Sequence, residues 1–301
     1  MISDVLTKDK KDVKHAVFKT AFIGLIVNLL LTLFKFIGGI IGGSQAVVAD
    51  AFHGLSDLLT DLTIIVGVHF WSKPPDQCHP HGHNRLETLI TLTIGVVLAF
   101  VGLGIIANAV ITIPERHTTP PSFIAFWAAF TSLVTKEILY QWTVKIGRRV
   151  KSMSTIANAW HHRSDALSSI PAVIAVSAAV ILPEWSFIDH IGAVIVALFI
   201  FQAAYKIITP SFNKLIDSGA PAEVIDKIET IAMETEGVQS VHKIRSRYIS
   251  SSSLAVDLHI EVDGTLSVKA GHNISERVKE RLLDFGPDIV DVVVHLEPFP
   301  E

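Results

Sequence analysis

The amino-acid sequence predicts a polytopic α-helical membrane protein with a smaller C-terminal α+β domain, and three observations support this fold class. The 301 residues are 50% hydrophobic and only 18% charged, with a mean hydropathy of +0.47, whereas soluble domains carry about 25% charged residues. Six apolar stretches of roughly 20 residues or more precede residue 209, each long enough to cross ~30 Å of hydrocarbon. Residues 1–208 hold 16 Lys/Arg against 13 Asp/Glu, whereas residues 209–301 hold 9 against 16.

This composition excludes several classes of protein. A wholly cytosolic enzyme would not carry so many apolar stretches. The high apolar content and a net charge of only −4 exclude a disordered chain or one that coats nucleic acid. The single cysteine, Cys78, excludes a disulfide framework. Fourteen histidines are unusual in so apolar a chain.

The predicted spans are separated by turn-forming Gly, Ser and Pro residues. They lie near residues 16–41, 45–71, 86–113, 122–146, 155–182 and 187–208. The first span carries Lys19 near its start, which does not fit a cleaved signal peptide.

Basic residues in the short loops predict the orientation of the spans. Lysines lie in the N-terminal arm, and basic residues cluster in the second and fourth loops. In the loops on the opposite side, Arg116 is the single basic residue. Both termini are therefore expected in the cytoplasm, most simply of a bacterial inner membrane. Residues 1–15 would form a cytoplasmic arm, 16–208 the membrane domain and 209–301 a cytoplasmic domain.

The tail is predicted to fold in the order α-β-β-α-β. Helices are expected over residues 221–236 and 267–285, and strands over 241–249, 254–262 and 288–295, because the apolar residues recur at helical or alternating spacing. This order indicates a small two-layer domain with a mainly antiparallel sheet.

Two of the predicted spans carry ionisable side chains on one helical face. In each span four polar residues follow at steps of three, four and four: Asp50, His53, Asp57 and Asp61 in the second, and Asn158, His161, Asp165 and Ser169 in the fifth. An ionisable group inside a membrane is costly unless it is paired or lines a cavity. The His-x-x-x-Asp motif of each span supplies one imidazole and one carboxylate, and together they form a ligand set suited to tetrahedral Zn²⁺.

Other interpretations of these polar residues remain open. Such side chains can simply hold helices together. Asp50 and Asp61 belong either to a proton or ion path or to hydrogen bonds between helices. His162 and Arg163 lie on other faces and are interpreted as packing or interfacial residues, and Lys35, Lys136 and Glu137 have no assigned role.

These features resemble the cation diffusion facilitator family, whose members are homodimeric antiporters of metal ions and protons. The resemblance covers about residues 15–297. Beyond the six spans, the His-rich second loop and the tail, it rests on the segments Ala49–His53, Gly82–Glu87 and Ala157–Asp165.

The resemblance implies specific metal sites. The transport site corresponds to His53, Asp57, His161 and Asp165, and a His at the first position is similar to members that favour Zn²⁺. A loop site corresponds to Asp76, His79 and His83, to which this chain adds Cys78 and His81. From the residues alone, that loop could equally be a solvated polar loop.

The resemblance also implies metal sites and a charge pair in the cytoplasmic parts. The tail sites correspond to His242, His259, His272, His295 and Glu297, the last where the family often has Asp. Without the resemblance these histidines would be read as surface residues. Arg85 and Asp217 correspond to a pair that locks the spans across the dimer.

The sequence thus predicts a transporter rather than an enzyme, one that exports Zn²⁺ from the cytoplasm in exchange for H⁺. Export of Fe²⁺, Cd²⁺, Co²⁺ or Mn²⁺ by the same fold is an alternative. A membrane zinc enzyme is a weaker alternative because the chain has no H-E-x-x-H or G-x-S-x-G motif. A metal sensor or scaffold would have no reason to keep ligands inside the spans.

Overall fold

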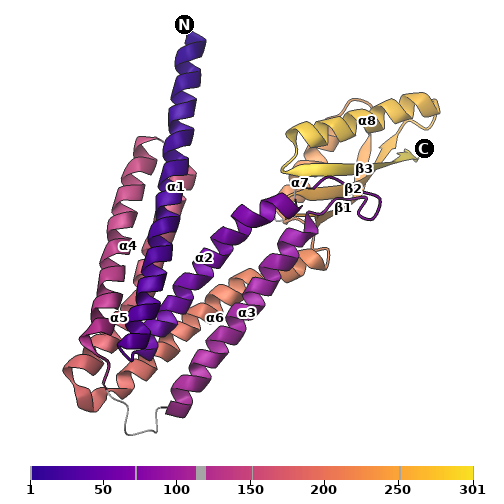
Figure 1. Ribbon diagram of the computed structural model, residues 1–301. Coiled ribbons are helices and arrows are strands. Elements are labelled where there is room, and N and C mark those ends of the chain that lie inside the picture. The colour runs from indigo at the N-terminus through magenta and orange to yellow at the C-terminus, as the bar shows by residue number, and fades with distance from the viewer. Residues whose placement is uncertain (1, 72, 113–119, 151, 251, 301) are drawn as a thin grey trace. The chain divides into compact units, whose positions relative to one another are not determined.

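The structure is a computed structural model that describes residues 2–71, 73–112, 120–150, 152–250 and 252–300 (Figure 1). The side chains of residues 2–16, 60–71 and 154 lie outside this description. The chain divides into two compact units. The first unit comprises residues 1–64 and 94–206, and the second comprises residues 65–93 and 207–301.

Long helices make up the membrane part of the chain. They are α1 (Ile2–Ile41), α2 (Gln45–Trp71), α3 (Arg85–Thr112), α4 (Phe123–Arg149), α5 (Met153–Ile181) and α6 (Phe187–Leu215), with a 3-10 turn η1 (Pro183–Trp185) before α6. In the described parts of the chain, α1 and α3 to α6 are each long and apolar enough to cross a membrane. The sixth long helix is α2, whose side chains are described only as far as residue 59.

Two helix boundaries differ from the sequence-based expectation. The N-terminal arm continues the first span, since α1 begins at Ile2. The sixth span does not end near Pro210 but runs to Leu215, because a proline removes one helical hydrogen bond and such losses are tolerated in membrane helices. The end of α6 is set instead by Asp217, which takes a left-handed backbone conformation (φ 60°) typical of a helix C-terminus.

Small residues allow close packing in the first unit. Val47 of α2 packs with alanines of α4 and with Val176 of α5. A side chain at Gly38 of α1 would place its Cβ 2.4 Å from the Cβ of Ala128 on α4, so α1 and α4 touch almost backbone to backbone. This is the usual way in which membrane helices associate, because apolar side chains gain little by leaving lipid.

The N-terminus of α2 is capped by a residue from α6. The carboxylate of Asp189 accepts hydrogen bonds from the Ser44 hydroxyl (2.5 Å) and from the backbone N–H of Gln45 (2.6 Å). The Asp189 side chain is buried, and the first backbone N–H groups of a helix have no partner within it. The cap therefore gives hydrogen-bond partners both to the buried carboxylate of Asp189 and to the first N–H of α2.

The tail folds as two helices on one three-stranded sheet (Figure 1). The elements are α7 (Ala222–Met233), β1 (Ser240–Tyr248), β2 (Leu254–Val262), α8 (Val268–Phe285) and β3 (Ile289–Pro298), which confirms the predicted order. Its core joins Ile228 of α7, Val278 and Leu282 of α8, and the inward residues of the central strand β2.

The expectation of a mainly antiparallel sheet is wrong. β1 pairs antiparallel with β2, but β2 pairs parallel with β3. The reason is the connection: α8 carries the chain back across the sheet between β2 and β3, and a helical crossover joins parallel strands. In this register His242 faces His259 across one ladder, and His259 faces His295 across the other.

Candidate metal centres

A buried cluster of ligand-type side chains lies between α2 and α5. His53 and Asp57 are one turn apart on α2, and Asp165 projects from α5. One ligand atom of each lies within 4.8 Å of the others. His53 and Asp165 are only 8% and 4% exposed.

Each residue of this cluster carries a buried polar atom without a hydrogen-bond partner in the part of the chain that the structure describes. Nδ1 of His53, Oδ2 of Asp57 and Oδ2 of Asp165 are buried and have no hydrogen-bond partner among the described residues. Buried polar atoms are normally hydrogen-bonded, so three unpartnered atoms on three clustered residues call for a ligand. A metal ion fits, since imidazole and carboxylate are ligands that Zn²⁺, Mn²⁺ and related ions accept.

His161 is not part of this cluster in the structure. Its side chain is 54% exposed, and its Nδ1 lies 3.7 Å from Oδ1 of Asp165. The four-residue spacing places His161 one turn from Asp165 but leaves its ring on the outer side of α5. The structure therefore brings together three of the four residues expected in the transport site.

Asp50 is held by neighbouring helices. Lys35 of α1 donates to its Oδ2 at 3.0 Å and to its backbone oxygen at 2.9 Å, and Ser169 of α5 donates to its Oδ1 at 2.7 Å. This is the interhelical hydrogen bonding that stood as the alternative to an ion path. The side chain of Asp61, the other residue considered for that path, lies outside the described residues.

Lys136 of α4 was given no role from the sequence, yet it lies beside the buried cluster. Its Nζ is 3.5 Å from Oδ2 of Asp165, and its side chain is 3% exposed. A lysine in the middle of an apolar helix is itself a signal of function. That signal could have identified Lys136, although not its partner.

His162 and Arg163 lie where packing residues were expected. His162 is buried, and its ring lies against α1 at Gly24. The guanidinium of Arg163 lies 4.7 Å from the ring centre of Tyr140 and donates to its hydroxyl at 3.2 Å. Neither side chain joins the buried cluster.

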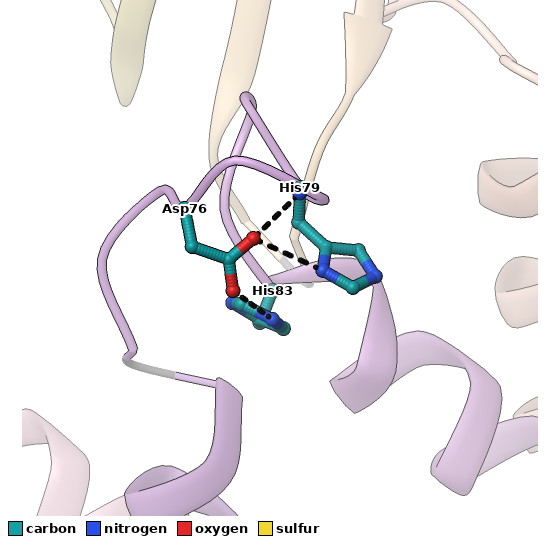
Figure 2. Close-up of side chains that lie close together, drawn as sticks. All are labelled: Asp76, His79 and His83. Carbon is teal, nitrogen blue, oxygen red and sulfur yellow. Dashed lines mark hydrogen bonds and ion pairs between the residues drawn. The ribbon is translucent and has the colours of Figure 1, made fainter.

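The loop between α2 and α3 brings Asp76, His79 and His83 together as predicted (Figure 2). Nδ1 of His79 lies 3.3 Å and Nε2 of His83 lies 3.5 Å from the Asp76 carboxylate. The backbone N–H groups of His79 and Cys78 also donate to that carboxylate, and they hold the pKa of Asp76 below its usual range. Cys78 is exposed and is not within the ligand group.

The tail holds a third cluster on adjacent strands. Glu297 of β3 accepts from Nδ1 of His259 at 2.8 Å and lies 3.1 Å from Nε2 of His242. The hydrogen bond from His259 holds the pKa of Glu297 below its usual range. His295 is more exposed, and its Nε2 lies 3.4 Å from the Glu297 carboxylate. These side chains meet because the register of β1, β2 and β3 places His242, His259 and His295 side by side.

His272 is placed away from that cluster. It lies on α8 and lines a separate pocket with Ser275, Glu276 and Lys279 against β3. Of the five tail residues expected to bind metal, the structure gathers four.

Comparison with known proteins decides the family. The cation efflux transmembrane domain family matches residues 21–216, and the cytoplasmic domain family of cation efflux proteins matches residues 220–299. The chain belongs to the cation diffusion facilitator family. It is therefore a transporter of metal cations and an integral membrane protein, not an enzyme.

Relatives of this cation diffusion facilitator cover nearly its whole length. The manganese efflux system protein MneP of Bacillus subtilis is 31% identical over 288 residues, 94% of this chain and 96% of MneP. An uncharacterized transporter of Methanocaldococcus jannaschii is 34% identical over 266 residues, 88% of this chain and 92% of the relative. The magnetosome protein MamB of Magnetospira is 28% identical over 272 residues, 90% of this chain and 92% of MamB.

The charge pair expected in this transporter forms within one chain. Arg85, at the start of α3, donates to Asp217, which follows α6, and both side chains are about half exposed. The sequence suggested a pair that acts across the dimer. In the structure this contact needs no second protomer.

Proposed function

We propose that the chain exports Zn²⁺ from the cytoplasm in exchange for protons, using the buried cluster between α2 and α5 as the transport site. The observation that carries this proposal is that His53, Asp57 and Asp165 form one cluster and that each carries a buried polar atom without a hydrogen-bond partner among the described residues. Family membership supports cation efflux in general, and the cluster supplies a place for the cation inside the bilayer.

His161 would complete the site when the ion is bound. Its Nδ1 is 3.7 Å from Asp165, so a change of side-chain rotamer brings the ring toward the ion. Two imidazoles and two carboxylates then match the tetrahedral preference of Zn²⁺. The two carboxylates offset the charge of a divalent ion that has lost its water.

Manganese is the second candidate. The relatives MneP and MneS, 31% and 29% identical, are manganese efflux proteins. Mn²⁺ favours oxygen ligands and a higher coordination number, whereas a second imidazole favours Zn²⁺. The preference between Zn²⁺ and Mn²⁺ therefore depends on whether His161 binds the ion.

Proton exchange follows from the chemistry of the ligands. Imidazole and carboxylate must be deprotonated to hold a metal, so binding releases protons and proton uptake releases the metal. Histidine titrates near neutral pH, which suits it to this exchange. Exposure of the site to each side in turn would come from rocking of one helix group against the rest.

The remaining parts are proposed to regulate transport. With both termini in the cytoplasm, the tail and the loop of Asp76 would face the metal before it is exported. Metal at the cluster of His242, His259 and Glu297 would stabilise a homodimer and bias transport. The acidic tail, with a net charge of −7 from 9 basic and 16 acidic residues, would attract cations to the inner mouth.

Transport into proteoliposomes tests the proposal. With the inside acidic, Zn²⁺ uptake should exceed Mn²⁺ uptake and should fall when the pH gradient is collapsed. The Asp57→Asn variant should be inactive. A preference for Mn²⁺ would identify Mn²⁺ as the substrate instead. Zinc flux that does not depend on the pH gradient would contradict proton exchange. An active Asp57→Asn variant would show that the buried cluster is not the transport site.

A further inference from the structure

We propose that Lys136 is a tethered counter-cation that competes with the transported ion for Asp165. This inference rests on the proposed function, because it takes the cluster of His53, Asp57 and Asp165 as the transport site. It assigns to Lys136 the role of a residue that sets how tightly the site holds its ion.

The position of Lys136 gives it no water to contact. It lies 13 residues from each end of α4, about 20 Å along the helix from either end. Its side chain is 3% exposed and cannot reach the bilayer surface. An ammonium at this depth needs a carboxylate nearby, and among the side chains that the structure describes Asp165 lies within 4 Å.

The second buried lysine of this unit shows what a purely structural pair looks like. Lys35 donates two hydrogen bonds to Asp50, at 2.9 and 3.0 Å, and Ser169 holds the other oxygen of the same carboxylate. Each oxygen of that carboxylate therefore accepts a hydrogen bond. It is not one of the three residues that gather their ligand atoms within 4.8 Å.

Lys136 and Asp165 form a looser pair. Their closest atoms are 3.5 Å apart, and Oδ2 of Asp165 has no hydrogen-bond partner among the residues described. The same oxygen is thus close to an ammonium and open to a metal. The lysine is close enough to attract the carboxylate but does not occupy this oxygen with a hydrogen bond.

The charges of the site explain why the lysine matters. With Lys35 assigned to Asp50, the cluster holds two carboxylates, Asp57 and Asp165, and one ammonium, Lys136. In the empty site the lysine offsets part of the repulsion between the carboxylates. In the loaded site it repels the divalent ion, and this repulsion is strong because little water screens it. Lys136 therefore stabilises the empty site relative to the loaded one and favours release.

Metal binding by uncharged variants tests this role. The background is the full chain in detergent with Asp76→Asn and Glu297→Gln, which weakens the loop and tail clusters so that the tightest binding of Zn²⁺ or Mn²⁺ in a titration reports the buried site. Lys136→Gln and Lys136→Met should lower the Kd at least about tenfold. In proteoliposomes, the same variants should lower both KM and kcat, since a tightly held ion leaves slowly.

Two control variants separate this role from loss of a structural ion pair. Lys136→Arg keeps the charge and should bind the ion like the background. Lys35→Gln removes a buried lysine that does not contact a ligand, and it should change the Kd much less. A substitution that only destabilises the packing of the helices would weaken metal binding. Tighter binding by the uncharged variants would therefore not be expected if Lys136 had only a structural role.

Each other result contradicts the proposal. If the uncharged variants bind the ion no more tightly than the background, Lys136 does not compete with it, and the proposed transport site still stands. If they fail to fold even with saturating metal, the lysine is structural, because the ion should replace its charge. If the background itself binds no ion, the proposed function fails together with this inference.

Discussion

The buried cluster of α2 and α5 and the tail cluster of β1 to β3 use the same chemistry in opposite surroundings. Each combines imidazole and carboxylate groups within 4.8 Å. In the tail, Glu297 is already hydrogen-bonded to His259, and its side chain is 28% exposed. In the membrane part, Oδ2 of Asp57 and Oδ2 of Asp165 are buried and have no hydrogen-bond partner among the described residues.

This difference shows how burial decides the use of a metal site. Water can reach the partly exposed Glu297 carboxylate when no metal is present, although Nε2 of His242 is buried without a hydrogen-bond partner among the described residues. Carboxylates inside the bilayer have no such alternative and need a proton, a lysine or a metal ion at all times. The buried cluster is therefore suited to exchanging cations, and the tail cluster to sensing them.

Loss of a buried ligand should have the largest effect. Asp165→Asn removes one of the two carboxylates of the proposed transport site, and metal flux in proteoliposomes should fall by more than the roughly 100-fold that loss of an outer-shell partner can cost. Asp284→Asn, an exposed position on α8, is the matched control and should transport normally. Near-normal flux through Asp165→Asn would remove the contrast between the two clusters.

Loss of a buried hydrogen bond should come next. Ser169→Ala leaves Oδ1 of Asp50 without its donor in a fully buried place, and we expect a destabilisation of about 1–3 kcal/mol in thermal unfolding with detergent. Ser275→Ala on α8 removes a longer, partly exposed bond of 3.3 Å and should cost less. Equal destabilisation by the two substitutions would show that burial does not raise the cost of losing a hydrogen bond here.

Disabling the tail cluster should affect binding more than transport. In full-length protein with Asp57→Asn, the further change Glu297→Gln should weaken the remaining Zn²⁺ binding about tenfold, measured by calorimetry. With the buried site intact, Glu297→Gln should reduce flux no more than about threefold, because regulation is altered but the route is not. Glu280→Gln on α8 is the control. Flux as low as that of Asp165→Asn would place the tail cluster on the transport route.

The smallest effect is expected from an exposed carboxylate outside any metal cluster. The hydroxyl and backbone N–H of Thr265 donate to Asp263 and hold its pKa below the usual value. The ionised form thus stabilises the turn, with its full contribution above the unfolded pKa of 3.8, and this contribution is lost as pH falls through the folded pKa. Asp263→Asn should lower Tm by no more than about 2 °C at pH 7, and the difference should shrink only as pH falls below 3.8 toward the lowered folded pKa. A difference that persists in acid would show that charge is not the cause.

Much of the fold could be predicted from the sequence because it depends on local periodicity. The long apolar stretches predicted the helices of the membrane part, and alternation predicted β2 at its observed bounds, Leu254–Val262. The end of α6 could not be predicted from Pro210, since only the left-handed turn at Asp217 ends it. The parallel pairing of β3 depends on the path of α8 across the sheet.

The candidate site was predictable for a similar reason and only in part. Helical spacing placed His53 and Asp57 on one face, and the repeated motif pointed to Asp165. Spacing does not set a side-chain rotamer, so the outward ring of His161 could not be foreseen. Lys136 has no motif, and its partner Asp165 lies on a different helix.

The cap that Asp189 places on α2 constrains how the transport site can move. If α2 slid away from α6, a buried carboxylate and the first N–H groups of α2 would lose their partners together, at a cost of about 1–3 kcal/mol for each group. A conformation in which the two helices separate would therefore need new partners for these groups to be well populated. The helix that carries His53 and Asp57 is therefore expected to move together with α6 as one rigid body. Relative movement during transport is expected between other helices of the bundle.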